Sequence, residues 1–232
     1  MVAGGETEQG DWKSDEVIDL MDSTLKNEIY RDEKSKRFGS TGGLINNQPI
    51  ICGGFGGPFD DYHQGSTYTV RGQSKDSYQM LEKRRQHPSS VVLNQTNLWV
   101  TGGSTVNKST EFISLDQPVR KGPELPFTTS CHSMVLIDSK TIFLIGGYQN
   151  SQSSKKTWII DPTRNFEIKS GPDLNEARVA HLCSKMNIGP KIYLVVAGGY
   201  GNDGTLDSIE ILDTTSLDQG WTLGNNLTRY EN

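Results

Sequence analysis

The sequence of 232 residues is short of the features that mark several large classes of protein. Its three cysteines, Cys52, Cys131 and Cys183, cannot all pair within one chain, and no two have CxxC spacing. A disulfide framework and a cysteine-rich zinc site are therefore disfavoured. Its 23 Lys and Arg residues are fewer than its 28 Asp and Glu residues. Because no basic excess attracts a phosphate backbone, we expect no nucleic-acid partner.

Hydrophobic runs are short as well. The longest, such as 192–197, have the length of a strand and not of a bilayer span, so we expect no membrane insertion. The N-terminus has neither the cationic start nor the apolar run of a signal peptide. The compartment stays open, with a cytoplasmic location slightly favoured and secretion as the alternative.

Internal repetition, in contrast, extends through the whole chain. A diglycine follows an apolar run at five places, and the first glycines are 49, 49, 44 and 52 residues apart. A polar loop and a strand-like run, often ending in Asp, come next, and 208–211 alternates polar and apolar residues with the period of a strand. A Gly-x-x-Leu pattern follows in three of the units. The diglycines are Gly4-Gly5, Gly53-Gly54, Gly102-Gly103, Gly146-Gly147 and Gly198-Gly199.

Each unit of about fifty residues predicts four short strands joined by turns. A lone sheet of this kind leaves both apolar faces in water, and stacking the sheets face to face around an axis buries them, as in a β-propeller. The helices that a parallel α/β sheet requires are missing from the pattern. The predicted fold is an all-β propeller.

The apolar run with its diglycine, the aromatic residue in the following strand, the Gly-x-x-Leu pattern and the period resemble kelch repeats. The resemblance covers essentially the whole chain and implies a kelch-type β-propeller in which the diglycine ends the second strand of each four-stranded blade. Glycine suits that position because it permits a positive φ and a close approach of neighbouring backbone. The implied organisation is one domain, 1–232, of four full blades and one partial blade. Approximate units are 1–37, 38–86, 87–130, 131–179 and 180–232.

The pattern opens and stops part-way through a unit. We expect a fragment of a longer gene product in preference to an incomplete five-bladed ring, because an unclosed ring exposes two blade faces and unpaired strand edges.

Enzyme motifs are missing from the sequence: it has no Gly-x-Ser-x-Gly elbow, HExxH or Walker loop. We predict no enzymatic activity, no catalytic residues and no cofactor. The resemblance implies a protein- or peptide-interaction module acting as a scaffold or substrate-recognition surface, such as the ubiquitin-ligase adaptors or actin-associated proteins of the family. The alternative is a secreted carbohydrate-binding or galactose-oxidase-like propeller. Such an oxidase needs converging Tyr, His and Cys ligands, whereas Cys52 fits better as a small core residue.

Three histidines, His87, His132 and His181, are 45 and 49 residues apart, which predicts that they occupy the same phase of the repeat. Converging imidazoles could bind a metal, but no carboxylate shares their phase, and residues in phase usually repeat one structural role. We predict buried or rim histidines and no metal.

Arginines form the first candidate binding site. Arg84 and Arg178 each precede one of these histidines by three residues, and Arg229 falls at the matching place in the last unit, whereas Thr129 breaks the pattern. In kelch propellers such arginines often face the end of the channel where a peptide docks, which implies an acidic peptide as the partner. The alternative role is a structural ion pair with a neighbouring blade. The predicted surface consists of Arg84, Arg85, Arg178 and Arg229.

Loops that follow the diglycines form the second candidate surface, because a rigid scaffold positions them and tyrosine is an adaptable contact residue. Three aromatics within 55–62 exceed what a turn requires, so that loop ranks highest. The predicted contact residues are Phe55, Phe59, Tyr62, Tyr148 and Tyr200. Glycosylation sequons begin at Asn94, Asn107 and Asn226, a number close to chance, and their use stays open.

Overall fold

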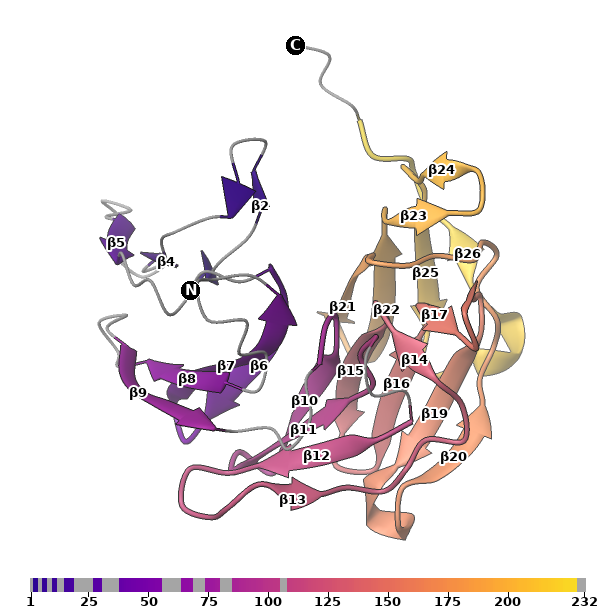
Figure 1. Cartoon of the computed structure of the whole chain (residues 1–232). Helices are drawn as coiled ribbons and strands as arrows, with labels where there is room; N and C mark the ends of the chain where they lie inside the picture. Colours follow the sequence, from indigo (N-terminus) through magenta and orange to yellow (C-terminus); the bar gives the residue numbers. More distant parts are fainter. Residues whose placement is uncertain are drawn as a thin grey trace. The chain divides into compact units, whose positions relative to one another are not determined.

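The computed structural model describes residues 38–54, 85–104 and 108–228 with their side chains, and the backbone of short strands before and between these ranges (Figure 1). Among the described residues, the regular structure is β-strand apart from two three-residue 3₁₀ turns, η2 (Pro162–Arg164) and η3 (Leu217–Gln219). The all-β prediction is therefore confirmed. Among the described residues no helix has the length and apolarity needed to cross a membrane. The chain divides into two compact units, Met1–Glu124 and Leu125–Asn232.

Unit 1 is built on two four-stranded antiparallel meanders, of order β6-β7-β8-β9 and β10-β11-β12-β13. A three-stranded sheet of order β1-β4-β5 and the hairpin β2-β3 precede them in the chain. The small elements are β1 (Val2–Ala3), β2 (Glu6–Thr7), β3 (Gly10–Asp11), β4 (Asp15–Ile18) and β5 (Asn27–Tyr30). The first meander has β6 (Phe38–Ile45), β7 (Gln48–Phe55), β8 (Gln64–Tyr68) and β9 (Ser74–Gln79). The second has β10 (Ser89–Leu93), β11 (Asn97–Thr101), β12 (Thr110–Ile113) and β13 (Arg120–Lys121).

The core of unit 1 lies between these two meanders. Ile50 and Cys52 of β7 are buried against Leu98 and Val100 of β11 in one hydrophobic cluster. Burial of such side chains is the main driving force for packing one sheet on another. Cys52 is fully buried here, in agreement with its interpretation as a core residue.

Unit 2 repeats the arrangement with meanders of order β15-β16-β19-β20 and β21-β22-β25-β26 (Figure 1). The small sheet β14-β17-β18 and the hairpin β23-β24 lie at the end where the diglycines follow the second strands. The first meander has β15 (Ser133–Asp138), β16 (Thr141–Ile145), β19 (Thr157–Asp161) and β20 (Glu167–Ser170). The second has β21 (Leu182–Ile188), β22 (Lys191–Ala197), β25 (Ile209–Asp213) and β26 (Thr222–Leu223). The small strands are β14 (Thr129–Ser130), β17 (Tyr148–Gln149), β18 (Gln152–Ser153), β23 (Tyr200–Gly201) and β24 (Gly204–Thr205).

The core of unit 2 is again a sandwich of two meanders. Val135, Phe143 and Ile145 of the first meander pack against Leu194 and Val196 of the second. In both units, therefore, one face of a four-stranded sheet is covered by the opposite face of the sheet that follows it in the chain. The four meanders fall within 38–86, 87–130, 131–179 and 180–232. Their closure into a propeller and the single domain 1–232 remain predictions.

The diglycines stand at the end of the second strand of each meander, as predicted. All eight glycines of the four pairs in the described residues have positive φ, between 57° and 109°. At Gly147 an added Cβ would lie 2.6 Å from the carbonyl oxygen of Ser130, so no larger residue fits without moving backbone. The amide of Gly147 donates to the carbonyl of Arg178, which ties the first meander of unit 2 to the segment that opens the second.

Candidate functional site

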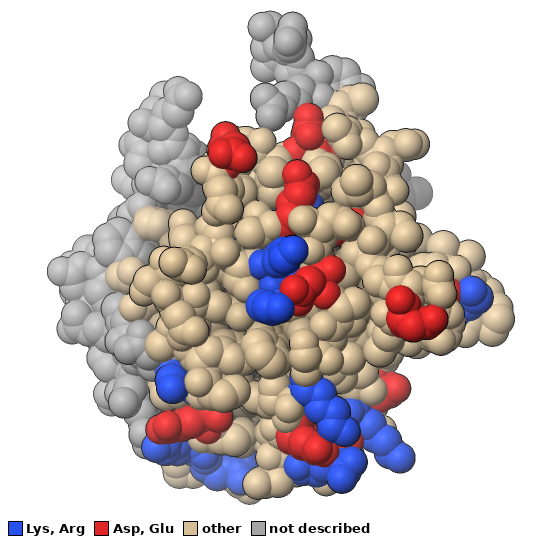
Figure 2. Space-filling model, turned by 90° about the vertical axis from the view of Figure 1, so that its right-hand side faces the viewer, with Lys and Arg blue, Asp and Glu red and all other residues tan. Residues whose placement is uncertain are grey.

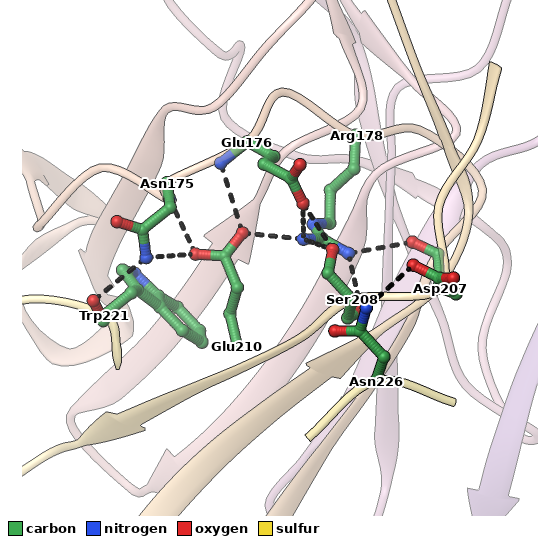
Figure 3. A network of polar contacts seen from close by, with 9 residues as sticks. Asn175, Glu176, Arg178, Asp207, Ser208, Glu210, Trp221 and Asn226 are labelled. Atoms are coloured by element: carbon green, nitrogen blue, oxygen red, sulfur yellow. Dashed lines mark hydrogen bonds and ion pairs between the residues drawn. The ribbon is translucent and has the colours of Figure 1, made fainter. Parts of the chain in front are cut away.

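The predicted arginine Arg178 lies at the centre of a buried polar network in unit 2 (Figure 3). Its Nη2 is 2.7 Å from Oε1 of Glu210, and both side chains are fully buried. Nη2 also donates to Oγ of Ser208 at 3.0 Å, and Nη1 donates to the carbonyl of Gly198 at 3.0 Å. A buried charge pair requires this many additional bonds because both ions have lost their water.

The carboxylate of Glu210 is held from its other side as well. The backbone amide of Asn175 donates to Oε2 at 2.6 Å, and the amide of Glu176 donates to Oε1 at 3.2 Å. The side chain of Asn175 bonds both Glu210 and the carbonyl of Trp221 (Figure 3). The network therefore joins the segment before β21 to β25 and to the segment that opens β26.

Arg85 makes a corresponding set of contacts in unit 1, with an additional bond from its Nε to Glu111. Its Nη2 lies 2.6 Å from Glu111 Oε1, and the two side chains are 0% and 3% exposed. Nη1 donates to the carbonyls of Gly102 and Ser109, and Nη2 donates to Oγ of Ser109. Gly102, Ser109 and Glu111 correspond in the repeat to Gly198, Ser208 and Glu210. The same buried arginine–glutamate pair therefore recurs in two meanders, and it connects the first glycine and the third strand to the segment before the first strand. We call this arrangement the arginine lock; its ion pairs are Arg85–Glu111 and Arg178–Glu210.

Neither guanidinium is accessible to a docked peptide in this arrangement. The alternative role named for these arginines, a structural ion pair, describes the geometry of Arg85 and Arg178. The basis for an acidic partner weakens accordingly, because both cations are neutralised by carboxylates. Arg84 and Arg229, the other predicted members of the surface, lie outside the described residues.

The first meander of unit 2 lacks this ion pair and replaces it with a different set of side chains. Thr129 stands where Arg85 and Arg178 stand, and Trp158 stands where the glutamates stand. Gln149 supplies the missing donor: its Nε2 bonds the carbonyl of the first glycine, Gly146, at 3.1 Å. Its Oε1 accepts from the indole Nε1 of Trp158 at 3.1 Å.

An aromatic stack completes the replacement. The rings of Phe127 and Trp158 have centroids 4.8 Å apart and planes 25° from parallel. Offset stacking of this kind is favourable for buried aromatic pairs. In this meander, Gln149, Trp158 and Phe127 are neutral groups that take the positions of the arginine–glutamate pair found in the meanders before and after it.

The three histidines do not share one position, which corrects their predicted phase. His87 corresponds to Cys131 and Ala180, because all three have φ between 51° and 53° just before a first strand. His132 and His181 occupy the next position, which is Pro88 in unit 1. Both are buried, as predicted for a structural role. The ring of His181 packs over Gly146, where an added Cβ would lie 2.8 Å from Cε1.

Burial keeps these two imidazoles neutral. Burial, and then the neighbouring His181, lower the pKa of His132 from 6.5 to about 3. Burial, and then the charge of Arg178, lower the pKa of His181 to about 4. Neither ring nitrogen of His181 has a hydrogen-bond partner among the described residues. Within the same residues, no group of three or more His, Cys, Asp or Glu side chains could hold a metal ion.

Of the predicted contact residues, Tyr148 and Tyr200 have described side chains, and the two residues are 42% and 58% exposed. Each follows the second glycine of its meander, so the two occupy one phase at the same end of unit 2. Tyr148 pairs with Ser130, and Tyr200 forms a bridge with Val179. We call this surface the tyrosine rim; it consists of Tyr148, Asn150, Tyr200 and Asn202, of which both asparagines are exposed.

The hairpin that carries Tyr148 is held in place on both sides. Asn150 and Ser151 form its tight turn with φ of 50° and 67°. The amide of Asn150 donates to Oγ1 of Thr128 at 3.0 Å, and Gln149 is fixed by the bonds to Gly146 and Trp158. Turns with two positive φ angles match the twist of a hairpin, so Tyr148 is presented in a preorganised position.

Three acidic residues lie in the segments around Tyr200. Asp203 lies in the turn of β23-β24, and Asp207 and Glu176 lie in adjacent segments. Glu176 shares the single guanidinium of Arg178 with Glu210, so this group of three keeps a net charge of −1. Figure 2 shows acidic side chains at the upper end of the face it views and mixed charges at the lower end.

The loop that ranked highest in the sequence lies largely outside the described residues. Phe55 ends β7, where only its backbone is described, and Phe59 and Tyr62 lie outside the described residues. Of the sequons, Asn94 lies exposed in the turn between β10 and β11, and Asn226 is exposed and donates to Asp207 at 3.3 Å. Asn107 is not among the described residues.

Comparison with known proteins leaves the family open. No protein-family model matches the chain, and no curated protein is similar to it in sequence. The resemblance to kelch repeats therefore depends on the repeat pattern alone.

Sequence reasoning missed the partners of the arginines. Glu111 and Glu210 lie in the third strands of their meanders, at one phase of the repeat, and each comes two residues after a serine that directly precedes the strand. Glutamate in phase with arginine in two units, and both absent from the unit between, was the signal that could have identified the lock.

Proposed function

We propose that this chain is a protein- or peptide-interaction module of the kelch type, that its meanders close into a β-propeller, and that it binds its partner through the tyrosine rim. The observation that carries the proposal is the pair of exposed tyrosines, Tyr148 and Tyr200, at one phase of adjacent meanders. Exposed tyrosines on rigid loops are typical contact residues because they bury a large area with little loss of conformational entropy.

The character of the rim favours a neutral or basic peptide over the acidic one expected from the arginines. Arg85 and Arg178 are paired with internal carboxylates, whereas Asp203 lies in the turn that follows Tyr200, and Asp207 and Glu176 lie in adjacent segments. Complementary charge raises the rate of association and suppresses partners of the same sign.

Panning the full chain against a displayed library of random peptides tests the proposal, followed by calorimetry with the peptides recovered. We expect Tyr148→Ala with Tyr200→Ala to weaken binding by a factor of about ten or more, because each exposed aromatic anchor typically contributes more than 1 kcal/mol. The thermal midpoint should stay at the parent value, since neither ring is part of the core.

A matched control changes two exposed residues at the other end of the strands, Lys140→Ala with Gln219→Ala, which should bind like the parent. Peptides that bind the double tyrosine variant as tightly as the parent, or a library that yields no peptide above background, would contradict the proposal.

A further inference from the structure

The two hairpins of the tyrosine rim, β17-β18 and β23-β24, correspond residue for residue. Tyr148 stands opposite Ser153 in the first hairpin, and Tyr200 stands opposite Thr205 in the second, each around a two-residue turn. The first residue of both turns is an asparagine. A peptide that lies across the rim therefore meets the same tyrosine and asparagine twice.

Charge distinguishes one hairpin from the other. The second residue after each hairpin is Lys155 in the first case and Asp207 in the second. Lys155 is exposed and forms no ion pair within the described part of the chain, whereas its neighbour Lys156 is paired with Asp173 at 2.8 Å. The carboxylate of Asp207 accepts a hydrogen bond from the side-chain amide of Asn226, which is neutral. The two equivalent positions thus have opposite charges, and neither charge is neutralised by these neighbours.

A second pair of equivalent positions adds to the difference. Glu176 occupies the place in the second meander of unit 2 that Phe127 occupies in the first. The side chain of Glu176 is 44% exposed, and it accepts a hydrogen bond from Ser208, the residue that follows Asp207 (Figure 3). Hairpin β23-β24 is bonded to the segment that follows Glu176. The rim is therefore positive beside Tyr148 and negative beside Tyr200.

Backbone hydrogen bonds fix the places of both charges. The carbonyl of Lys155 accepts from the amide of Leu174 at 2.8 Å, and the carbonyl of Asp207 accepts from the amide of Leu227 at 2.7 Å. The two leucines belong to the Gly-x-x-Leu pattern and are equivalent in the repeat. The opposite charges consequently lie at defined positions on two adjacent meanders of one unit.

We propose that the tyrosine rim binds an extended peptide in one direction, with a basic residue of the peptide beside Tyr200 and an acidic residue beside Tyr148. This inference rests on the peptide binding proposed above, and it adds the order of the charges. A reversed peptide would place like charges together, which disfavours it. Packed sheets lie about 10 Å apart and an extended chain rises about 3.3 Å per residue, so we expect the two charged residues to be about three positions apart.

Two synthetic peptide libraries of equal composition and zero net charge test the proposal. In one library a fixed Glu precedes a fixed Arg by about three positions, and in the other the order is reversed; both termini are blocked and the remaining positions carry the same neutral residues. The parent chain should prefer one library by a factor of about ten, since each exposed charge pair contributes modestly. The preference should shrink at high salt, because exposed charges are screened.

Lys155→Glu combined with Asp207→Lys gives the decisive measurement. It keeps the net charge of the chain and exchanges the charges of the two hairpins, so the preference should pass to the other library. The control Lys140→Glu with Asp218→Lys makes the same exchange in exposed turns at the opposite ends of the strands, and it should keep the preference of the parent. If circular dichroism detects unfolding of the first variant, Lys155→Gln with Asp207→Asn replaces it and should bind both libraries equally.

The outcomes separate this inference from the proposed function. Equal binding of both libraries by the parent, or a preference that survives the exchange of charges, would overturn the direction of binding and leave peptide binding at the rim intact. Loss of that binding in the Tyr148→Ala, Tyr200→Ala chain would still support the rim. A parent chain that binds neither library nor any peptide recovered by panning would contradict the proposed function, and the inference with it.

Discussion

Nη2 of Arg178 lies 2.7 Å from Oε1 of Glu210, and neither side chain has any contact with solvent. The same relation holds between Arg85 and Glu111 in unit 1 at 2.6 Å. A charge pair in this position fastens the third strand of a meander to the segment that precedes its first strand.

Arg178→Ala should lower the stability of unit 2 by about 3–5 kcal/mol, because it leaves the carboxylate of Glu210 buried without its cation. Urea unfolding followed by circular dichroism measures the loss. The control is Lys121→Ala, which breaks the exposed pair with Glu124 and should cost less than about 1 kcal/mol. An Arg178→Ala chain as stable as its parent would restore this arginine as a candidate for ligand contact.

Thr129→Arg alone should destabilise unit 2, because the new cation would face Trp158, whereas the corresponding position in the adjacent meanders is a glutamate that can pair with it. Combining Thr129→Arg with Trp158→Glu should recover part of the loss, so the two changes should be non-additive by about 1–3 kcal/mol in a double-mutant cycle. If the two changes instead lower stability additively, the arginine–glutamate pair requires other neighbouring residues that the first meander of unit 2 lacks.

Gly147→Ala should cost several kcal/mol or prevent folding, because φ is 81° and the new Cβ would lie 2.6 Å from the carbonyl oxygen of Ser130. Gly189→Ala is a matched control: its φ of 57° is also left-handed, but nothing lies within 4 Å of the added atom. The control should cost about 1–2 kcal/mol, the strain of the backbone alone. Equal losses at the two positions would show that close approach is not what requires glycine in the pair.

Stability should fall as the pH drops from about 6.5 to 4. His181 is neutral in the folded chain, since burial and then Arg178 lower its pKa from 6.5 to about 4. The unfolded chain therefore binds more protons in this window, and stability is fully present above it and lost on acidification. His132, with its pKa lowered to about 3 by burial and by His181, extends the loss to lower pH.

His181→Gln should flatten this pH dependence, because glutamine cannot take up a proton. Chemical unfolding at a series of pH values measures both slopes. A parent chain whose midpoint is constant between pH 4 and 6.5 would show that protons reach the folded imidazole without cost.

Much of the fold was predictable because the repeated residues are ones that the local backbone geometry requires. The diglycines mark second-strand ends since only glycine tolerates positive φ next to a neighbouring backbone, as at Gly147. The strand positions followed from alternation and from the period. The exact phase of the histidines was not predictable, because loops of unequal length shift the spacing by one residue and only backbone angles reveal it.

The candidate site was predicted in part. Tyr148 and Tyr200 are exposed in loops, as their positions after the diglycines indicated. Arg178 was assigned to a binding surface because arginines at this place in kelch propellers often face the end of the channel, whereas its burial depends on Glu210, which is 32 residues away along the chain. The shared phase of arginine and glutamate in two repeats indicates that the residues are related, but the burial of the pair follows from the packing of the folded strands.

The hydrogen bond between Trp158 and Gln149 gives the chain an optical reporter of its own. Gln149 is the neighbour of Tyr148 in the two-residue strand β17, and its side chain accepts a hydrogen bond from the indole of Trp158. A displacement of Tyr148 should therefore shift Gln149 and change this hydrogen bond. Trp158 is half-buried, whereas Trp99 and Trp221 are buried, so its emission is the one among these three that should respond to events at the rim. Occupation of the rim can therefore be followed by intrinsic fluorescence, with no label attached to the chain.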